Sequence, residues 1–90
     1  MAKIIKEKPS PAQLESLQVH TWSPWECEPS TFDWTYDAEE TAYILKGEVT
    51  VTCPDGQQVD LGPGDLVRFP QGLSCTWNVR EKIRKVYRFA

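Results

Sequence analysis

Few residues of this 90-residue chain are of the types that bind metals or attack substrates, and they are widely spaced. The one histidine is His20, and a lone histidine is more often a hydrogen-bonded or exposed residue than a metal ligand. The three cysteines, Cys27, Cys53 and Cys75, are an odd number without CxxC spacing. We therefore expect neither a zinc knuckle nor a disulfide framework, and a reducing, cytoplasmic compartment.

Carboxylates form one small cluster, made of Asp37, Glu39 and Glu40, at the expected end of a strand. Such a cluster can collect a cation, and it can equally be a solvated loop. The formal net charge of the whole chain is −3, which argues against a nucleic-acid-binding protein. No apolar run approaches the roughly 20 residues of a membrane-spanning helix.

Short strands between tight turns must position these side chains, because apolar and polar residues alternate along much of the chain. One such face carries Phe32, Trp34 and Tyr36. A later face carries Leu73, Cys75, Trp77 and Val79. Turns rich in Gly and Pro separate the segments, which predicts a sandwich or a barrel.

The two ends of the chain carry further structural signals. Ser10 and Gln13 form a capping box around Pro11, which predicts a short helical turn, and residues 19–22 are expected to form a short strand. Residues 83–89 are expected to close the chain as a strand. The basic residues near the C-terminus are interpreted as the solvated side of this last strand together with charges at the sheet edge, with an anion-binding patch as the alternative; they are Arg80, Lys82, Arg84, Lys85 and Arg88.

Segment 40–72 resembles the cupin superfamily. Glu40 and Gly47 have the spacing of its first motif, and Gly64, Pro70 and Gly72 that of its second. The strings YILKGEVTV and LGPGDLVRFPQG are similar to very small cupins grouped as cupin_3 or DUF861-like proteins of unknown function. The resemblance implies one domain over residues 1–90, with the motifs at about 34–79. It also implies an all-β, RmlC-like jelly-roll barrel with a short N-terminal helical turn.

The metal ligands of the superfamily are mostly replaced in this sequence. By the resemblance, its two first-motif histidines fall at Trp34 and Tyr36, and its second-motif histidine falls at Cys75. Only Glu40 is retained. An indole nitrogen is a donor only, and a Glu with a Cys supplies too few ligands for a closed site. We therefore expect no metal and no other cofactor.

The resemblance also implies that the residues at these positions converge inside the barrel. The predicted ligand-binding residues are Trp34, Tyr36, Glu40, Tyr43, Cys75 and Trp77. An aromatic-lined cleft with a few polar groups is typical of a small-molecule site, but aromatic side chains can also simply fill a narrow barrel. Glu40 is a candidate proton donor or acceptor unless Tyr36 or a backbone amide satisfies it. Cys75 is a candidate nucleophile, the alternative being an inert buried thiol.

Three functions are open at this point. We favour a module that binds a small organic molecule in the barrel without a catalytic metal. The next is a non-catalytic scaffold with a filled barrel, and small cupins of this kind are commonly homodimers. The least favoured is an enzyme that uses Glu40 with Cys75 or Tyr36, with or without an atypical metal site.

Overall fold

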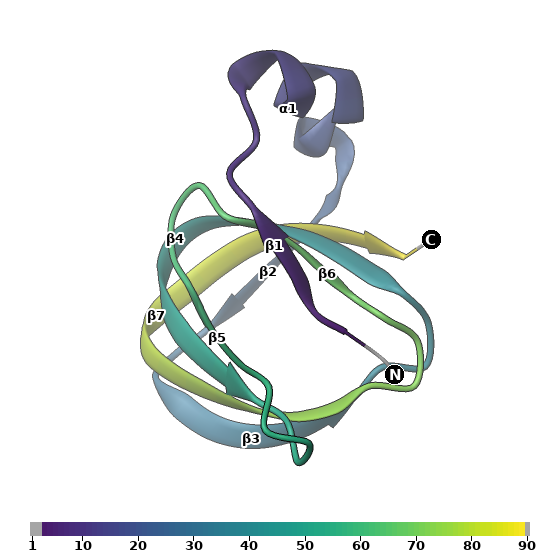
Figure 1. Ribbon diagram of the computed structural model, residues 1–90. Coiled ribbons are helices and arrows are strands. Elements are labelled where there is room, and N and C mark those ends of the chain that lie inside the picture. Colours follow the sequence, from purple (N-terminus) through teal and green to yellow (C-terminus); the bar gives the residue numbers. More distant parts are fainter. Residues whose placement is uncertain (1–2, 90) are drawn as a thin grey trace.

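The computed structural model describes residues 3–89 and shows a barrel of β-strands with a short helix at one end (Figure 1). In chain order the elements are β1 (Ile5–Glu7), α1 (Pro11–Leu17), the 3-10 turn η1 (Val19–Thr21), β2 (Ser23–Cys27), β3 (Ser30–Thr35), β4 (Glu40–Thr52), β5 (Gln58–Leu61), β6 (Leu66–Phe69) and β7 (Ser74–Phe89). The predicted all-β fold with a short N-terminal helical turn is confirmed. In the described part of the chain, no helix is long and apolar enough to cross a membrane.

Helix α1 begins as its sequence predicts. The backbone nitrogen of Gln13 donates to Ser10 Oγ over 3.2 Å, and the backbone nitrogen of Ser10 donates to Gln13 Oε1 over 3.0 Å. The strand expected at residues 19–22 is wrong. Gln18 adopts a left-handed conformation, and the backbone nitrogen of Thr21 then donates to the Gln18 carbonyl, which closes a 3-10 turn instead.

Two long strands, β4 and β7, pair along nearly their whole length and hold the barrel together. The first half of β4 pairs with β6 on its other side, and its second half pairs with β5. Strand β7 likewise pairs with β3 through its first half and with β2 through its second. The short strand β1 extends the sheet beyond β6. Each long strand therefore runs through both layers of the barrel.

The bend that carries β4 from one layer to the other is at Gly47. Here the backbone has φ +91°, and the β4–β7 register is irregular on both sides. A Cβ at this position would collide with the carbonyl oxygen of Lys82 on β7. Only glycine allows both this conformation and this close approach of two backbones. The glycine of the first motif is therefore needed to form the bend in β4.

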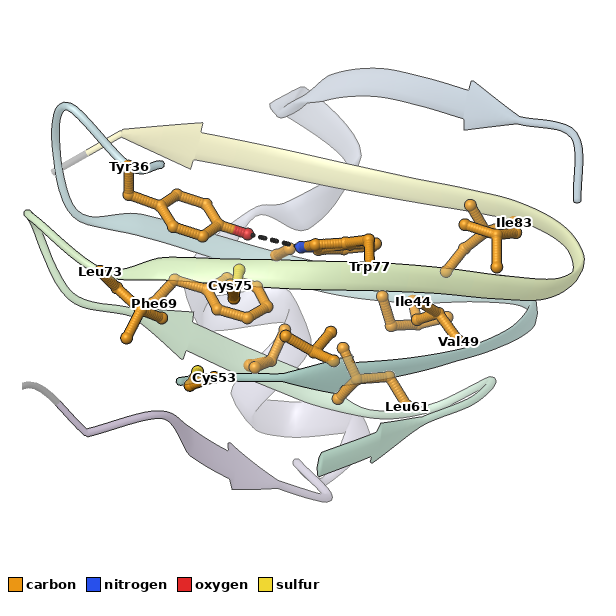
Figure 2. Close-up of a cluster of buried hydrophobic side chains, with 14 residues drawn as sticks. Tyr36, Ile44, Val49, Cys53, Leu61, Phe69, Leu73, Cys75, Trp77 and Ile83 are labelled. Carbon is orange, nitrogen blue, oxygen red and sulfur yellow. Dashed lines mark hydrogen bonds between the residues drawn. The ribbon is translucent and has the colours of Figure 1, made fainter. Parts of the chain in front are cut away.

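One half of the interior is filled by side chains (Figure 2). Phe69 lies near its centre, where its ring stacks on Tyr36 with centroids 4.7 Å apart and contacts Trp77 at 5.7 Å. Around them pack aliphatic residues from β4, β5, β7 and the turn that precedes β7, among them Ile44, Val49, Leu61, Leu73, Val79 and Ile83. This packed half supports one wall of the cavity described next.

Candidate functional site

A cavity of about 370 Å³ lies beside the packed core. Strands β2, β3 and the C-terminal half of β7 supply most of its wall. Its lining consists of Trp25, Cys27, Phe32, Trp34, Tyr36, Glu40, Trp77, Lys85, Tyr87 and Phe89. Seven of these ten side chains are aromatic, so the wall is predominantly apolar and offers flat surfaces for stacking.

The polar part of the cavity is an ion pair between Glu40 and Lys85. Lys85 Nζ donates to Glu40 Oε2 over 2.7 Å, and the two residues are only 5% and 4% exposed. Lys85 lies opposite Ile44 on β4, four residues from Glu40, so its long side chain must reach along the paired strands to the carboxylate. A buried charge is tolerated when it is paired, and here each residue supplies the partner that the other needs.

Aromatic rings surround the ammonium of Lys85. Its Nζ lies 4.7 Å from the ring centroid of Trp77, 4.9 Å from that of Trp25 and 5.5 Å from that of Tyr87. The negative faces of such rings attract a cation at these distances. Burial nevertheless lowers the pKa of Lys85 from its ordinary 10.5, while the adjacent Glu40 carboxylate acts in the opposite direction.

Tyr36 and Trp77 form the inner end of the cavity. The Trp77 indole nitrogen donates to the Tyr36 hydroxyl oxygen over 3.2 Å, as the dashed line in Figure 2 marks. Burial is the main cause that raises the pKa of Tyr36 well above its ordinary value, and the Glu40 carboxylate adds to it. The phenol therefore stays protonated, with its hydroxyl tied to the neighbouring indole.

Trp34 and Phe89 lie where the cavity meets the surface, with exposed fractions of 51% and 57%. The rings of Trp34 and Tyr36 are nearly perpendicular, at an interplanar angle of 76°, with their centroids 6.4 Å apart. Large apolar side chains at the surface of a pocket are typical of a place where a ligand or partner docks. These two residues are the exposed aromatic part of the cavity wall.

Of the six predicted ligand-binding residues, Trp34, Tyr36, Glu40 and Trp77 line one cavity. Cys75 pairs with Trp34 across β3 and β7, but it lies within the packed core and not in the cavity lining. Burial raises the pKa of the Cys75 thiol to about 11. Tyr43 is partly buried and follows Ala42 on β4, so it faces the opposite side of the strand and is not in the lining either.

His20, Asp37 and Glu39 lie outside the cavity lining, whereas Cys27 is part of it. His20 is exposed on η1. In the acidic cluster, Glu40 turns inward, Glu39 pairs with Arg68 over 3.4 Å and Asp37 is exposed, so the cluster does not converge on one point.

Lys85 corrects the interpretation of the basic residues near the C-terminus. It is a buried partner of Glu40 and not part of the solvated side of the last strand. The alternation of β7 contains the signal that would have located it. Ile83, Lys85, Tyr87 and Phe89 share one face, and it continues the face of Trp77 and Val79. Trp25, opposite Lys85 on β2, was missed because its short strand carries little alternation.

The residues at the superfamily's metal position do not fit a metal. The Tyr36 hydroxyl stays protonated, the Cys75 thiol lies in the core, and the Trp34 indole has no lone pair to donate. The Glu40 carboxylate is already paired with the Lys85 ammonium, and that ammonium would repel a metal cation. Within residues 3–89, no three His, Cys, Asp or Glu side chains gather as a metal site requires.

Comparison with known proteins places this geometry in a family. The family model described as the EutQ-like cupin domain matches residues 14–87. A DUF861 family protein of Thermotoga maritima is 49% identical, and its structure superposes with a TM-score of 0.96 over 98% of this chain and all of that one. The resemblance to small DUF861-like cupins, and with it the jelly-roll fold, is thus confirmed.

Two comparisons with EutQ proteins give more distant matches. The structure of the Clostridium difficile EutQ protein has a TM-score of 0.66 at 23% identity, over 96% of this chain and 66% of that one, which bears on the fold alone. A Clostridioides difficile protein named acetate kinase EutQ is 31% identical over 62 residues, which is 69% of this chain. The chain spans only 39% of the length of that relative.

Proposed function

We propose that this chain, which belongs to the EutQ-like cupin family, binds a small, neutral, flat organic molecule in its aromatic cavity. The observation that carries the proposal is the Glu40–Lys85 ion pair, because it places the only charged groups among the described lining residues in contact with each other. An apolar pocket with a few convergent polar groups is the usual form of a small-molecule site.

The size and walls of the cavity favour a ligand with a flat body. A volume of about 370 Å³ is at the small end of the range of roughly 300–1,000 Å³ for ligand pockets. Phe32 and Trp77 already stack nearly parallel, with an interplanar angle of 14°, and Trp25 meets both rings edge-on. A planar ligand of one ring extends this arrangement toward the exposed Trp34.

The charge balance of the site favours a neutral ligand that carries one polar group. The charges of the Glu40 carboxylate and the Lys85 ammonium cancel, so a further charge brought into the cavity would have no free partner among the lining residues within 3–89. An ammonium has three N–H donors, and one of them bonds to Glu40. A carbonyl or hydroxyl oxygen of the ligand can accept from another.

The tryptophans allow a direct test by NMR of their indole N–H groups. Benzamide and benzyl alcohol, as neutral probes, are expected to shift the resonances of Trp25, Trp34 and Trp77. Trp22 is the internal control, because it lies outside the cavity with its ring under the Arg88 guanidinium. Benzoate and benzylammonium, which have the same shape but a charge, are expected to bind more weakly.

Each signal is assigned by changing one tryptophan at a time to phenylalanine. Saturable shifts at the three cavity indoles, with Trp22 unchanged, would support the proposal. The proposal fails if no cavity indole shifts at probe concentrations up to about 10 mM, beyond which affinity is too weak to be meaningful. It also fails if Trp22 shifts as much as the others, since that reports general surface contact.

A further inference from the structure

We propose that Lys85 is a reactive amine that captures a small aldehyde or ketone in the cavity by forming an imine with it. This inference rests on the proposed function and narrows its ligand class to carbonyl compounds. It goes further in assigning covalent chemistry to a side chain that a binding module needs only as a hydrogen-bond donor.

The position of Lys85 is that of an enclosed nucleophile. Lys85 is part of the cavity wall, yet its side chain is only 7% exposed, so a reacting molecule must enter the cavity to meet it. The rings of Trp25, Trp77 and Tyr87 lie 4.7–5.5 Å from its Nζ and give that nitrogen a largely aromatic environment. A lysine in a hydrophobic pocket is one of the general ways in which proteins activate an amine.

Lys82 provides the contrast within the same strand. Lys82 Nζ lies 3.2 Å from a Glu28 carboxylate at the surface, and hydrogen bonding to Glu28 raises the pKa of Lys82. Burial lowers the pKa of Lys85, although a carboxylate lies even closer to it. The two lysines differ chiefly in burial, so at neutral pH a larger fraction of Lys85 is the free amine that attacks carbonyls.

Glu40 is placed to move the proton that this reaction requires. It takes one proton from the Lys85 ammonium over the 2.7 Å contact, and the free amine then forms a C–N bond to the carbonyl carbon. The oxygen receives that proton back from Glu40, and after a second transfer it leaves as water. The balance is R–NH3⁺ plus O=CR′2 giving R–NH⁺=CR′2 plus H2O, with Glu40 again a carboxylate.

The surroundings of Lys85 suit the product as well as the reactant. The protonated imine carries its positive charge at the same nitrogen as the ammonium did. The Glu40 carboxylate and the three ring faces that stabilise the ammonium therefore also stabilise the iminium. A low-polarity enclosure further favours the release of water that the reaction requires.

The test is reductive trapping in the unmodified protein. The protein is incubated with benzaldehyde and sodium cyanoborohydride at neutral pH, digested, and the modified lysines are identified by mass spectrometry. We expect modification of Lys85 to exceed that of Lys82 severalfold, because burial lowers the pKa of Lys85 whereas Glu28 raises that of Lys82. The other described lysines, Lys3, Lys6, Lys8 and Lys46, serve as further internal references.

Variants separate the chemistry from simple entry into the cavity. Lys85→Arg keeps a cation for Glu40 but cannot form an imine, and it should abolish the preferential label, whereas Lys82→Arg should leave it unchanged. Glu40→Gln should slow labelling of Lys85 because the proton acceptor is lost. Circular dichroism spectra confirm that each variant is folded, and the wild-type comparison of lysines needs no variant at all.

The two possible failures are distinguishable by the indole signals. Equal labelling of Lys85 and Lys82, while benzaldehyde shifts Trp25 and Trp77, overturns the imine and leaves noncovalent binding intact. The absence of both the label and the shifts overturns the proposed function as well. Labelling of Lys85 that benzamide suppresses in competition would support the reaction inside the cavity.

Discussion

The Trp77 indole and the Tyr36 hydroxyl form a hydrogen bond of 3.2 Å in which neither side chain is more than 2% exposed. Both rings also contact Phe69, so the bond lies between two members of one packed aromatic group. At the position where the superfamily has an imidazole, this chain therefore has a phenol whose hydroxyl oxygen already accepts a hydrogen bond from Trp77. The bond separates the packed half of the interior from the cavity.

Removing the Tyr36 hydroxyl should destabilise the protein. In Tyr36→Phe the indole N–H of Trp77 loses its acceptor while it remains buried, which costs about 1–3 kcal/mol. Urea unfolding followed by tryptophan fluorescence measures this loss. Tyr43→Phe is the matched control, because Tyr43 is on the face of β4 that points away from the cavity. This variant should change the unfolding free energy by less than about 0.5 kcal/mol. Equal stability of both variants would show that the hydrogen bond contributes nothing.

The Glu40–Lys85 pair should show strong coupling in a double-mutant cycle. Glu40→Leu and Lys85→Met each leave an unpaired buried charge, and each should cost about 3–5 kcal/mol of unfolding free energy. The double variant removes both charges and should recover most of that loss. Additive losses in thermal or urea unfolding would contradict a direct pair. Lys82→Met, which breaks a surface pair, should cost less than about 1 kcal/mol.

The buried thiol of Cys75 should make stability fall in alkaline solution. Its pKa is raised from 9.0 to about 11 on folding, so above pH 9 the unfolded chain releases a proton that the folded chain keeps. This contribution is complete below pH 9 and is lost as pH rises through 11. Other groups titrate in the same range, so the measurement is the difference between wild type and Cys75→Ala in unfolding free energy from pH 8 to 11. A difference independent of pH would show that the thiol is not perturbed.

Replacing the glycine at the bend should damage the barrel. Gly47→Ala adds a Cβ against the Lys82 carbonyl at a φ of +91°, and we expect a loss of at least about 2 kcal/mol in stability. Gly56→Ala is the matched control, since its φ is +97° but an added Cβ meets nothing within 4 Å. That variant should lose only about 1 kcal/mol. Similar losses at both glycines would mean that backbone conformation, and not the collision, sets the cost.

The expectation of a homodimer concerns the assembly and has its own test. Sedimentation velocity at micromolar concentrations should give the mass of two 10.3 kDa chains. A small barrel gains buried surface by pairing across a two-fold axis. A monomer across the whole concentration range would exclude a stable dimer.

The barrel could be predicted from the sequence because the alternation of apolar residues and the spacing of the motif glycines both indicate the same strands and turns. The glycine at position 47 and the turns after β4 and β6 punctuate the chain at fixed places, and the alternation between them predicts the strands. The helix at Pro11 was equally predictable, because a capping box is a local device. The 3-10 turn at Val19–Thr21 was not, since an apolar residue followed by polar ones fits several short conformations.

The site was only partly predictable because its ion pair joins residues 45 positions apart. Glu40 followed from motif spacing, but Lys85 lies in a basic run. Only its apolar neighbours two positions away, Ile83 and Tyr87, distinguish it from the exposed Lys82. The depth of Lys85 depends on the continuous face that runs along all of β7, which appears only when residues 74–89 are treated as one strand. The interpretation of the basic residues as one solvated group is therefore wrong for Lys85, which is buried.

The sharing of β4 and β7 between both layers has a consequence for how the molecule moves. Neither layer can open without breaking backbone pairs that also belong to the other, so slow hydrogen exchange should appear as one cooperative unit across the two strands. Any adjustment of the cavity to a ligand must then come from rotation of the exposed side chains at its opening and from movement of the short strands β2 and β3. Each of these strands pairs with β7 alone. Strands β4 and β7 thus form a rigid support, and the part of the protein that can adapt to a ligand is the exposed aromatic part of the cavity wall.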